Sequence, residues 1–93
     1  MSPAVILVEP GYGWGWTDGR DTLEAPQPFE AVVESMGDEL HGEVRDPGHP
    51  YNGCPVVLSR RHIPWDGQVN VEIDGLDLGT VYGYASIPLE HLS

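Results

Sequence analysis

The sequence predicts a mainly β protein, with α+β character only at its margin, folded as a single domain over residues 1–93. We expect a small six-stranded β-barrel or a strongly bent sheet, with one short helix near residues 28–36. Three observations predict this class. Apolar residues occur in short runs or in strict alternation, twelve glycines and nine prolines favour many turns, and ninety-three residues allow one small core.

The first strands are expected where short apolar runs end at turn residues. Val5–Val8 is such a run, is rich in β-branched residues, and is followed by Pro10 and Gly11. Residues 40–44 alternate apolar and polar side chains, which predicts a half-exposed strand. Val56–Leu58 is a second continuous apolar run, and we expect it to form a buried strand.

The clearest strand signal lies at residues 69–74, where valine or isoleucine alternates with a polar residue. Asp74-Gly75 follows, and this pair is typical of a two-residue hairpin turn. We therefore expect a return strand over residues 76–82. In that register Glu72 lies opposite Asp77 on the same face of the hairpin.

Residues 28–36 are open to two interpretations. The apolar positions recur at helical spacing, with a proline at the expected first position and a glycine just past the end. This pattern favours a short helix, although alternation of the same residues also fits a strand. The helical positions are Phe29, Val32, Val33 and Met36, between Pro28 and Gly37.

Aromatic residues alternate with glycine near the N-terminus, at Tyr12, Trp14 and Trp16. An extended chain places all three rings on one face and only glycine on the other. The rings then either complete a small core, where large side chains contribute most, or form a platform that anchors a partner. Both interpretations stay open at this point.

Charge is the strongest constraint on partners. Fifteen carboxylates face four arginines, no lysine is present, and the formal net charge is -11. Such a chain is repelled by nucleic acid and by anionic membranes, and is attracted to basic protein surfaces. We therefore expect a basic or mixed-charge protein partner. Nucleic acid is disfavoured as a ligand.

The carboxylates are not evenly spread. Residues 18–46 contain nine of the fifteen, including the adjacent Asp38 and Glu39. Glu72 and Asp77 form a second expected cluster in the hairpin. Like charges held together either face water, meet a basic protein or bind a divalent cation. No spacing resembles a calcium-binding loop.

No constellation of residues predicts catalysis. The four histidines are scattered without metal-ligand spacing, and a lone cysteine, Cys54, cannot complete a zinc site. We expect no enzyme activity, no metal and no cofactor. Cys54 also excludes an internal disulfide, which is typical of a reducing compartment. The first residues lack the basic start of a signal peptide, and their apolar run is too short to cross a bilayer, so we expect a cytoplasmic protein.

From residue 29 to residue 92 the order of motifs resembles the HIRAN domain. The matching pieces are Gly37–Leu40, Arg45–Asn52, Val56–Leu58, and Gly83-Tyr84 with Pro88. The resemblance implies a six-stranded OB-type barrel, preceded by a short helix, that holds nucleic acid ends. We carry over the architecture alone, because phosphate contacts need basic residues that this acidic chain lacks.

These observations predict a small acidic protein–protein interaction module. Its size and charge are typical of a phage-encoded inhibitor or modulator of a host protein. The alternative is a HIRAN-like binder of nucleic acid ends, or a DNA mimic that acts on a nucleic-acid enzyme. The candidate binding residues are Tyr12, Trp14, Trp16, Asp38, Glu39, Glu72 and Asp77.

Overall fold

The structure of the protein, a computed structural model, describes residues 3–19, 22–60, 68–76 and 79–88. These residues form seven strands, and none of them is helical. The strands are β1 (Ala4–Pro10), β2 (Gly15–Trp16), β3 (Phe29–Met36), β4 (Glu39–Val44), β5 (Pro55–Arg60), β6 (Gln68–Leu76) and β7 (Gly79–Ser86).

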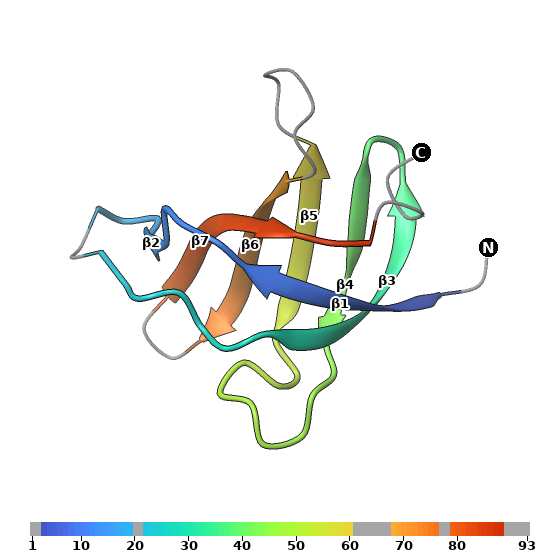
Figure 1. Cartoon of the computed structure of the whole chain (residues 1–93), viewed down its shortest axis with the longest axis horizontal. Coiled ribbons are helices and arrows are strands. Elements are labelled where there is room, and N and C mark those ends of the chain that lie inside the picture. Colours follow the sequence, from blue (N-terminus) through green and yellow to red (C-terminus); the bar gives the residue numbers. More distant parts are fainter. Residues whose placement is uncertain (1–2, 20–21, 61–67, 77–78, 89–93) are drawn as a thin grey trace.

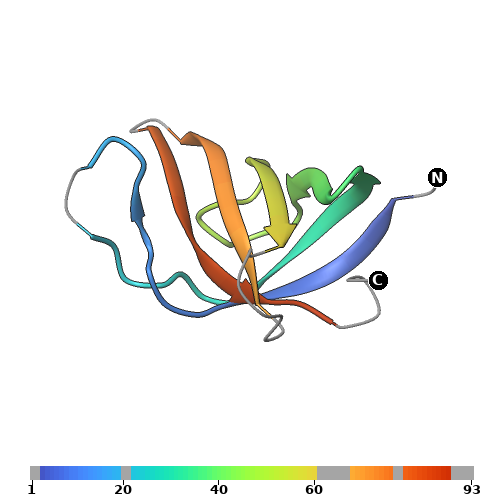
Figure 2. The ribbon, with the colours of Figure 1, turned by 90° about the horizontal axis from the view of Figure 1, so that it is seen from above.

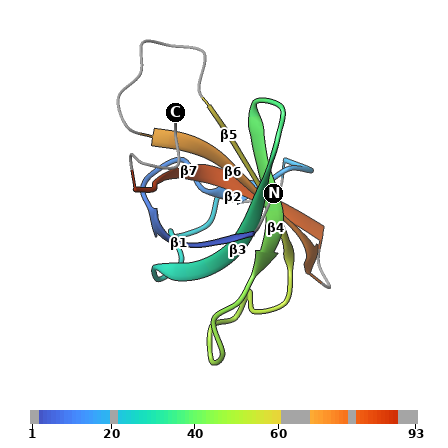
Figure 3. The ribbon, with the colours of Figure 1, turned by 90° about the vertical axis from the view of Figure 1, so that its right-hand side faces the viewer.

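Six of the strands close into an antiparallel barrel. The order is β1-β3-β4-β5-β6-β7, and pairing of β1 with β7 closes it (Figure 1). The two-residue β2 pairs with the opposite end of β7 as an extra strand. The sheet curls from β7 through β5 and β3 to β1 (Figure 2), and the β3–β4 hairpin and the β4–β5 loop lie at opposite ends of β4 (Figure 3). The predicted small mainly β barrel is therefore confirmed.

The predicted helix at residues 28–36 is wrong, because this segment is β3. Its alternating residues Phe29, Ala31 and Val33 are buried, whereas Glu30 and Glu34 are exposed. The strand pairs with β1 on one side and with β4 on the other. Pairing on both edges satisfies the backbone hydrogen bonds of the segment and overrides a local pattern that favours a helix.

The core lies inside the barrel and is lined by the inward side of every long strand. Because successive side chains of a strand point to opposite faces, buried residues alternate with more exposed ones along β1, β3, β6 and β7, whereas Val44 is the buried residue of β4. Among the described residues, no polar or charged side chain is buried. The buried apolar residues are Ile6, Val8, Trp14, Phe29, Ala31, Val33, Val44, Val56, Leu58, Val69, Val71, Ile73, Val81, Ala85 and Ile87.

The backbones of β3 and β4 approach closely at Gly42. A Cβ atom on Gly42 would lie 1.8 Å from the carbonyl oxygen of Val32 and 2.7 Å from the Cα of Val33. Both contacts are with backbone, so no side-chain rotation relieves them. Gly42 is therefore required for the close approach that turns the sheet into a barrel.

The predicted two-residue turn at Asp74-Gly75 is also wrong. Strand β6 continues to Leu76, which pairs with Gly79, and the register shifts between Ile73 and Leu76. Gly75 has a φ of 89°, so it provides an irregularity within the strand and not the tip of the hairpin. As a result Glu72 lies opposite Tyr82 and not opposite Asp77.

Candidate functional site

The aromatic row of the N-terminal segment does not share one face. Trp14 is 3% exposed and belongs to the core, whereas Tyr12 is 55% exposed and Trp16 is half-buried. Gly13 lies between the first two rings with a φ of 77°, a left-handed conformation that interrupts the strand. Trp14 is thus corrected from a candidate binding anchor to a core residue.

The alternating glycines make room for rings of β7. A Cβ on Gly13 would lie 3.0 Å from Cδ2 of Tyr84, and one on Gly15 would lie 3.7 Å from the hydroxyl oxygen of Tyr82. In return Gly83 faces inward, where an added Cβ would meet the Trp14 ring at 2.2 Å. The two segments therefore interlock: Trp14 lies under β7, and the two tyrosines lie over the glycines.

An open groove of about 270 Å³ lies on the outer face of the barrel, over β4, β5, β6 and β7. We call it the outer-face groove. Strand alternation places most of its lining side chains on the same outward side of the sheet. It is lined by Glu39, Val57, Ser59, Asn70, Val71, Glu72, Tyr82, Gly83 and Tyr84.

Strand register arranges this lining into two adjacent rows. Val57 pairs with Glu72, and Glu72 pairs with Tyr82. Two residues along each strand, the second row consists of Ser59, Asn70 and Tyr84. Outward neighbours on one strand are about 7 Å apart, so the two tyrosines of β7 form one continuous wall of the groove. The carboxylate of Glu72 lies across from that wall.

The two tyrosine rings are held differently. Tyr82 is 48% exposed. Tyr84 is half-buried, and its ring centroid lies 5.0 Å from that of Tyr12 at an interplanar angle of 47°. Backbone hydrogen bonds fix this contact, because the Tyr84 N–H donates to the Tyr12 carbonyl over 3.0 Å. Tyr12 therefore extends the aromatic surface beyond β7.

The candidate carboxylates occupy different positions. Within the described residues, the carboxylate of Glu72 has no hydrogen-bond or ion-pair partner. Glu39 Oε1, in contrast, lies 2.8 Å from His41 Nε2. Asp38 is exposed in the turn between β3 and β4 and does not line the groove. Asp77 lies outside the described residues. The structure thus brings Glu39 and Glu72 together with the aromatic surface.

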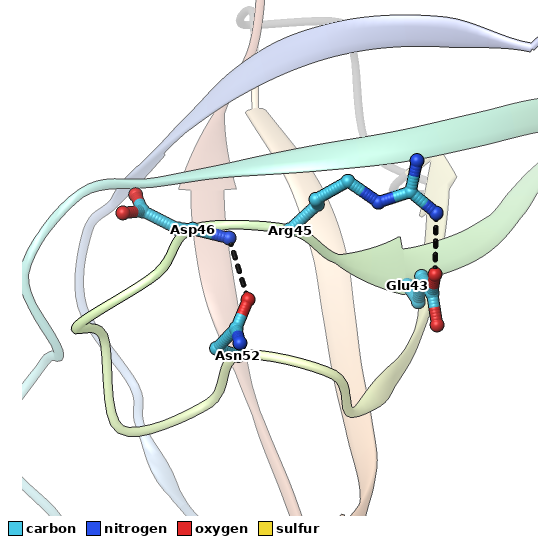
Figure 4. Close-up of polar contacts among 4 residues, drawn as sticks. All are labelled: Glu43, Arg45, Asp46 and Asn52. Atoms are coloured by element: carbon cyan, nitrogen blue, oxygen red, sulfur yellow. Dashed lines mark hydrogen bonds and ion pairs between the residues drawn. The ribbon is translucent and has the colours of Figure 1, made fainter.

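A second hollow lies over β3 and β4, and we call it the β3–β4 hollow. Its volume is about 480 Å³, and no phenylalanine, tyrosine or tryptophan is among its described lining residues. Arg45 there donates to Glu43 over 2.6 Å, as Figure 4 shows. The hollow is lined by Pro3, Val32, Glu34, His41, Gly42, Glu43, Arg45 and Pro55.

The β4–β5 loop, which carries the Arg45–Asn52 motif, is held by its own polar groups. The Asp46 N–H donates to Asn52 Oδ1 over 2.8 Å (Figure 4). Tyr51 N–H donates to His49 Nδ1, so His49 donates through Nε2 to the Gln27 carbonyl, 2.9 Å away. These bonds use the side chains of the motif to build the loop.

Cys54 follows this loop, and its surroundings do not activate the thiol. Partial burial and the nearby Asp74 carboxylate both raise the pKa of Cys54 above its ordinary value. Burial, followed by the charge of Cys54, likewise raises the pKa of Tyr51. A nucleophilic thiol needs the opposite shift. Both ring nitrogens of His49 are already engaged, one by the Tyr51 N–H in the loop and one by the Gln27 carbonyl before β3.

The described residues include neither a cluster of metal-binding side chains nor a membrane-spanning helix. No group of three or more histidine, cysteine, aspartate or glutamate side chains lies close enough to hold a metal ion. Nor does this part of the chain contain a helix with the length and hydropathy needed to span a bilayer.

Comparison with known proteins adds no relative: no protein-family model, curated protein or solved structure matches this chain. The resemblance of residues 29–92 to the HIRAN domain therefore stays a prediction.

The tyrosine wall of the groove was not among the binding residues predicted from the sequence. Tyr82 and Tyr84 were not chosen, although residues 81–85 alternate small or apolar residues with tyrosine. That alternation is the same signal that identified the strand at 69–74. Extending it to the next strand would have placed both rings on the face of Glu72.

Proposed function

We propose that this protein is a non-enzymatic interaction module whose outer-face groove receives a basic segment of a partner protein. The observation that carries the proposal is the lining of the groove. Two tyrosine rings face two glutamates, and no basic residue is among the described lining residues. A surface of this composition complements a cationic side chain in both charge and shape.

The two kinds of side chain have different roles in binding. A tyrosine ring attracts a cation through the negative potential of its face, an interaction of about 0.5–1 kcal/mol at exposed sites. Buried aromatic anchors commonly supply most of the binding energy at protein interfaces. Carboxylates at the rim mainly raise the association rate and reject acidic competitors. Tyr82 and Tyr84 are therefore the anchors, and Glu39 and Glu72 select the partner.

The charge of the whole molecule supports the same role. The net charge is -11, and no charged side chain is buried among the described residues. The negative field therefore extends into solvent, where it speeds the approach of basic proteins and opposes the approach of polyphosphates. We include in the proposal a cytoplasmic site of action and the role of a phage-encoded inhibitor or modulator of a host protein.

Fluorescence anisotropy with labelled Gly/Ser peptides of equal length tests this function. One peptide carries evenly spaced basic residues, one carries serine and one carries glutamate. We expect binding in that order, with weaker binding at higher salt. Equal binding of the acidic peptide, or direct binding of a labelled single-stranded oligonucleotide at moderate salt, would contradict the proposal.

A pair of truncations locates the binding surface. Tyr82→Ala is expected to weaken binding of the basic peptide by about tenfold, because it removes an exposed anchor of the groove. Leu7→Ala is the matched control, since Leu7 is similarly exposed at 44% but lies on β1, away from the groove. Thermal unfolding of both variants verifies that neither has lost its fold.

A further inference from the structure

We infer that the outer-face groove is specific for arginine: the guanidinium of a partner side chain stacks on the Tyr82–Tyr84 wall and bonds to Glu72. This inference rests on the proposed function and names the side chain that the groove selects. It follows from the positions of Glu72, Tyr82 and Tyr84 across the sheet, from the hydrogen-bond acceptors of Glu72 that have no partner within the described residues, and from the size of the groove.

The strand register places acceptors and rings where one flat cation contacts both. Glu72 lies directly opposite Tyr82, and such pairs have Cβ atoms about 4.5–5.5 Å apart. Asn70 lies opposite Tyr84 in the next row. A group that stacks on the tyrosine wall therefore lies within reach of the Glu72 carboxylate and of the Asn70 amide oxygen.

The groove offers several acceptors to a single ligand. Glu72 contributes two carboxylate oxygens that have no hydrogen-bond or ion-pair partner within the described residues. Ser59 and Asn70 contribute a hydroxyl and an amide oxygen on the neighbouring row. Arginine presents five N–H donors in a fixed plane, whereas lysine presents three donors on a compact, strongly hydrated ammonium.

Stacking on the tyrosine rings also favours arginine over lysine. A guanidinium is planar, weakly hydrated and stacks on aromatic faces while it makes a two-pronged bond to a carboxylate. The wall is also held in place, because Tyr84 packs on Tyr12 and lies beside Gly13, and the hydroxyl of Tyr82 lies beside Gly15. A wall that is already ordered loses little conformational entropy on binding.

The dimensions of the groove fit one side chain. Its volume of about 270 Å³ lies just below the range of about 300–1,000 Å³ that is typical of small-molecule sites. It is open along the outer face and lined from four neighbouring strands. The groove therefore has room for one long side chain.

Three peptides that differ only in one residue type test the inference. A Gly/Ser peptide carries several evenly spaced arginines, a second carries lysine at the same positions, and a third carries citrulline, the uncharged analogue of arginine. NMR titration follows the Asn70 side-chain amide and the backbone amides of Glu72, Tyr82 and Tyr84. We expect the arginine peptide to bind about fivefold more tightly than the lysine peptide, and citrulline to produce no shift.

Glu72→Gln is the decisive variant, with Glu30→Gln as its matched control. Both remove one exposed carboxylate, but Glu30 lies on β3 and does not line the groove. Glu72→Gln is expected to lower affinity for the arginine peptide by about tenfold and to remove the preference over lysine. Glu30→Gln is expected to change affinity by less than about twofold.

The outcomes separate the two proposals. If arginine and lysine peptides bind equally well and both lose affinity in Glu72→Gln, the arginine inference is overturned and the proposed function stands. If neither cationic peptide shifts the groove resonances, both are overturned. If citrulline binds as well as arginine, the groove recognises shape without charge, and the inference is again wrong.

Discussion

The outer-face groove and the β3–β4 hollow lie on the same barrel surface but differ in what their carboxylates contact. The hollow is the larger, at about 480 Å³ against about 270 Å³. Its Glu43 is paired with Arg45, and its described lining includes no phenylalanine, tyrosine or tryptophan. Glu72 in the groove has no partner within the described residues, and two tyrosines lie beside it.

The difference shows that volume is a poor guide to a binding surface on a small barrel. A carboxylate that already has a cationic partner gains little from a second one, and it must lose the first to bind it. An apolar ring next to a free carboxylate offers both binding energy and selection. The smaller groove is therefore the better candidate, and four predictions test the contrast.

The largest effect is expected at Trp14, which lies beneath the groove. Trp14→Ala removes a buried ring that packs on Gly83 and should lower the free energy of unfolding by about 3–5 kcal/mol. Chemical denaturation measures the loss. NMR shifts should change at Tyr82 and Tyr84 and much less around the β3–β4 hollow; the reverse pattern would show that Trp14 does not support the groove.

Trp14→Phe serves as the control for that variant. The indole Nε1 of Trp14 is buried without a hydrogen-bond partner among the described residues, and an unpaired buried donor costs about 1–3 kcal/mol. Phenylalanine keeps most of the packing and removes this donor. It should therefore be much less destabilising than alanine.

The corresponding support of the β3–β4 hollow is Gly42. Gly42→Ala inserts a Cβ against the backbone of Val32 and should cost about 3 kcal/mol, at the upper end of the overpacking range. Denaturant unfolding and the chemical shifts of β3 and β4 report the change. Gly37→Ala is not a suitable control because of its φ of 65°, so Ser35→Ala, an exposed site on β3, is used instead. A neutral Gly42→Ala would contradict the close crossing of the two strands.

A smaller effect is expected when the pairing in the hollow is broken. Arg45→Ala leaves Glu43 without its cation and makes the hollow more acidic. Because no tyrosine or tryptophan ring is among the described lining residues of the hollow, affinity for the basic peptide should rise by less than about threefold, mainly through the association rate. Stopped-flow kinetics at two salt concentrations measures this. A gain of tenfold would show that Arg45, and not the lack of rings, keeps the hollow from binding.

The smallest effect is expected at Asp74, near the β6–β7 hairpin. The Thr80 hydroxyl and the Gly75 N–H donate to its carboxylate, and they lower the pKa of Asp74 below its ordinary value of 3.8. The folded state therefore releases the proton more readily than the unfolded state. The resulting stability is present above about pH 4 and disappears as the pH falls through the lowered pKa.

Asp74→Asn tests this because asparagine keeps an acceptor oxygen but not the charge. Its melting temperature should lie slightly below that of the unaltered protein at about pH 6, and the difference should shrink by about pH 3. Asp38→Asn, an exposed site in the β3–β4 turn, is the control for the removal of one surface carboxylate. A difference that grows on acidification would mean that the hydrogen bonds do not favour the carboxylate.

The local sequence pattern was sufficient to predict an element where the pattern fits only one type of secondary structure. Residues 69–73 alternate strictly, and they form the inward and outward sides of β6 as expected. The pattern at 29–36 favours a helix but also fits a strand, and pairing with β1 and β4 decided for the strand. The Asp74-Gly75 pair suits a turn, yet pairing of Leu76 with Gly79 moved the hairpin tip further along the chain.

The candidate site was predicted only in part, for a related reason. Tyr12, Glu39 and Glu72 do converge on one face, whereas Trp14 enters the core and Asp38 lies to one side. The left-handed Gly13 separates the rings of Tyr12 and Trp14, and sequence alternation assumes that no such interruption occurs. Tyr82 and Tyr84 come together with the glutamates only because of the register of β6 and β7.

Composition and periodicity by themselves determined that this chain is an acidic, turn-rich β protein with one small core, since charge and alternation are properties of the chain at every point. Only the closed barrel decided which carboxylates lie beside tyrosine rings and which one pairs with an arginine. Register across strands joins residues that are far apart in the chain, and a shift of one residue would move each of them to the opposite face.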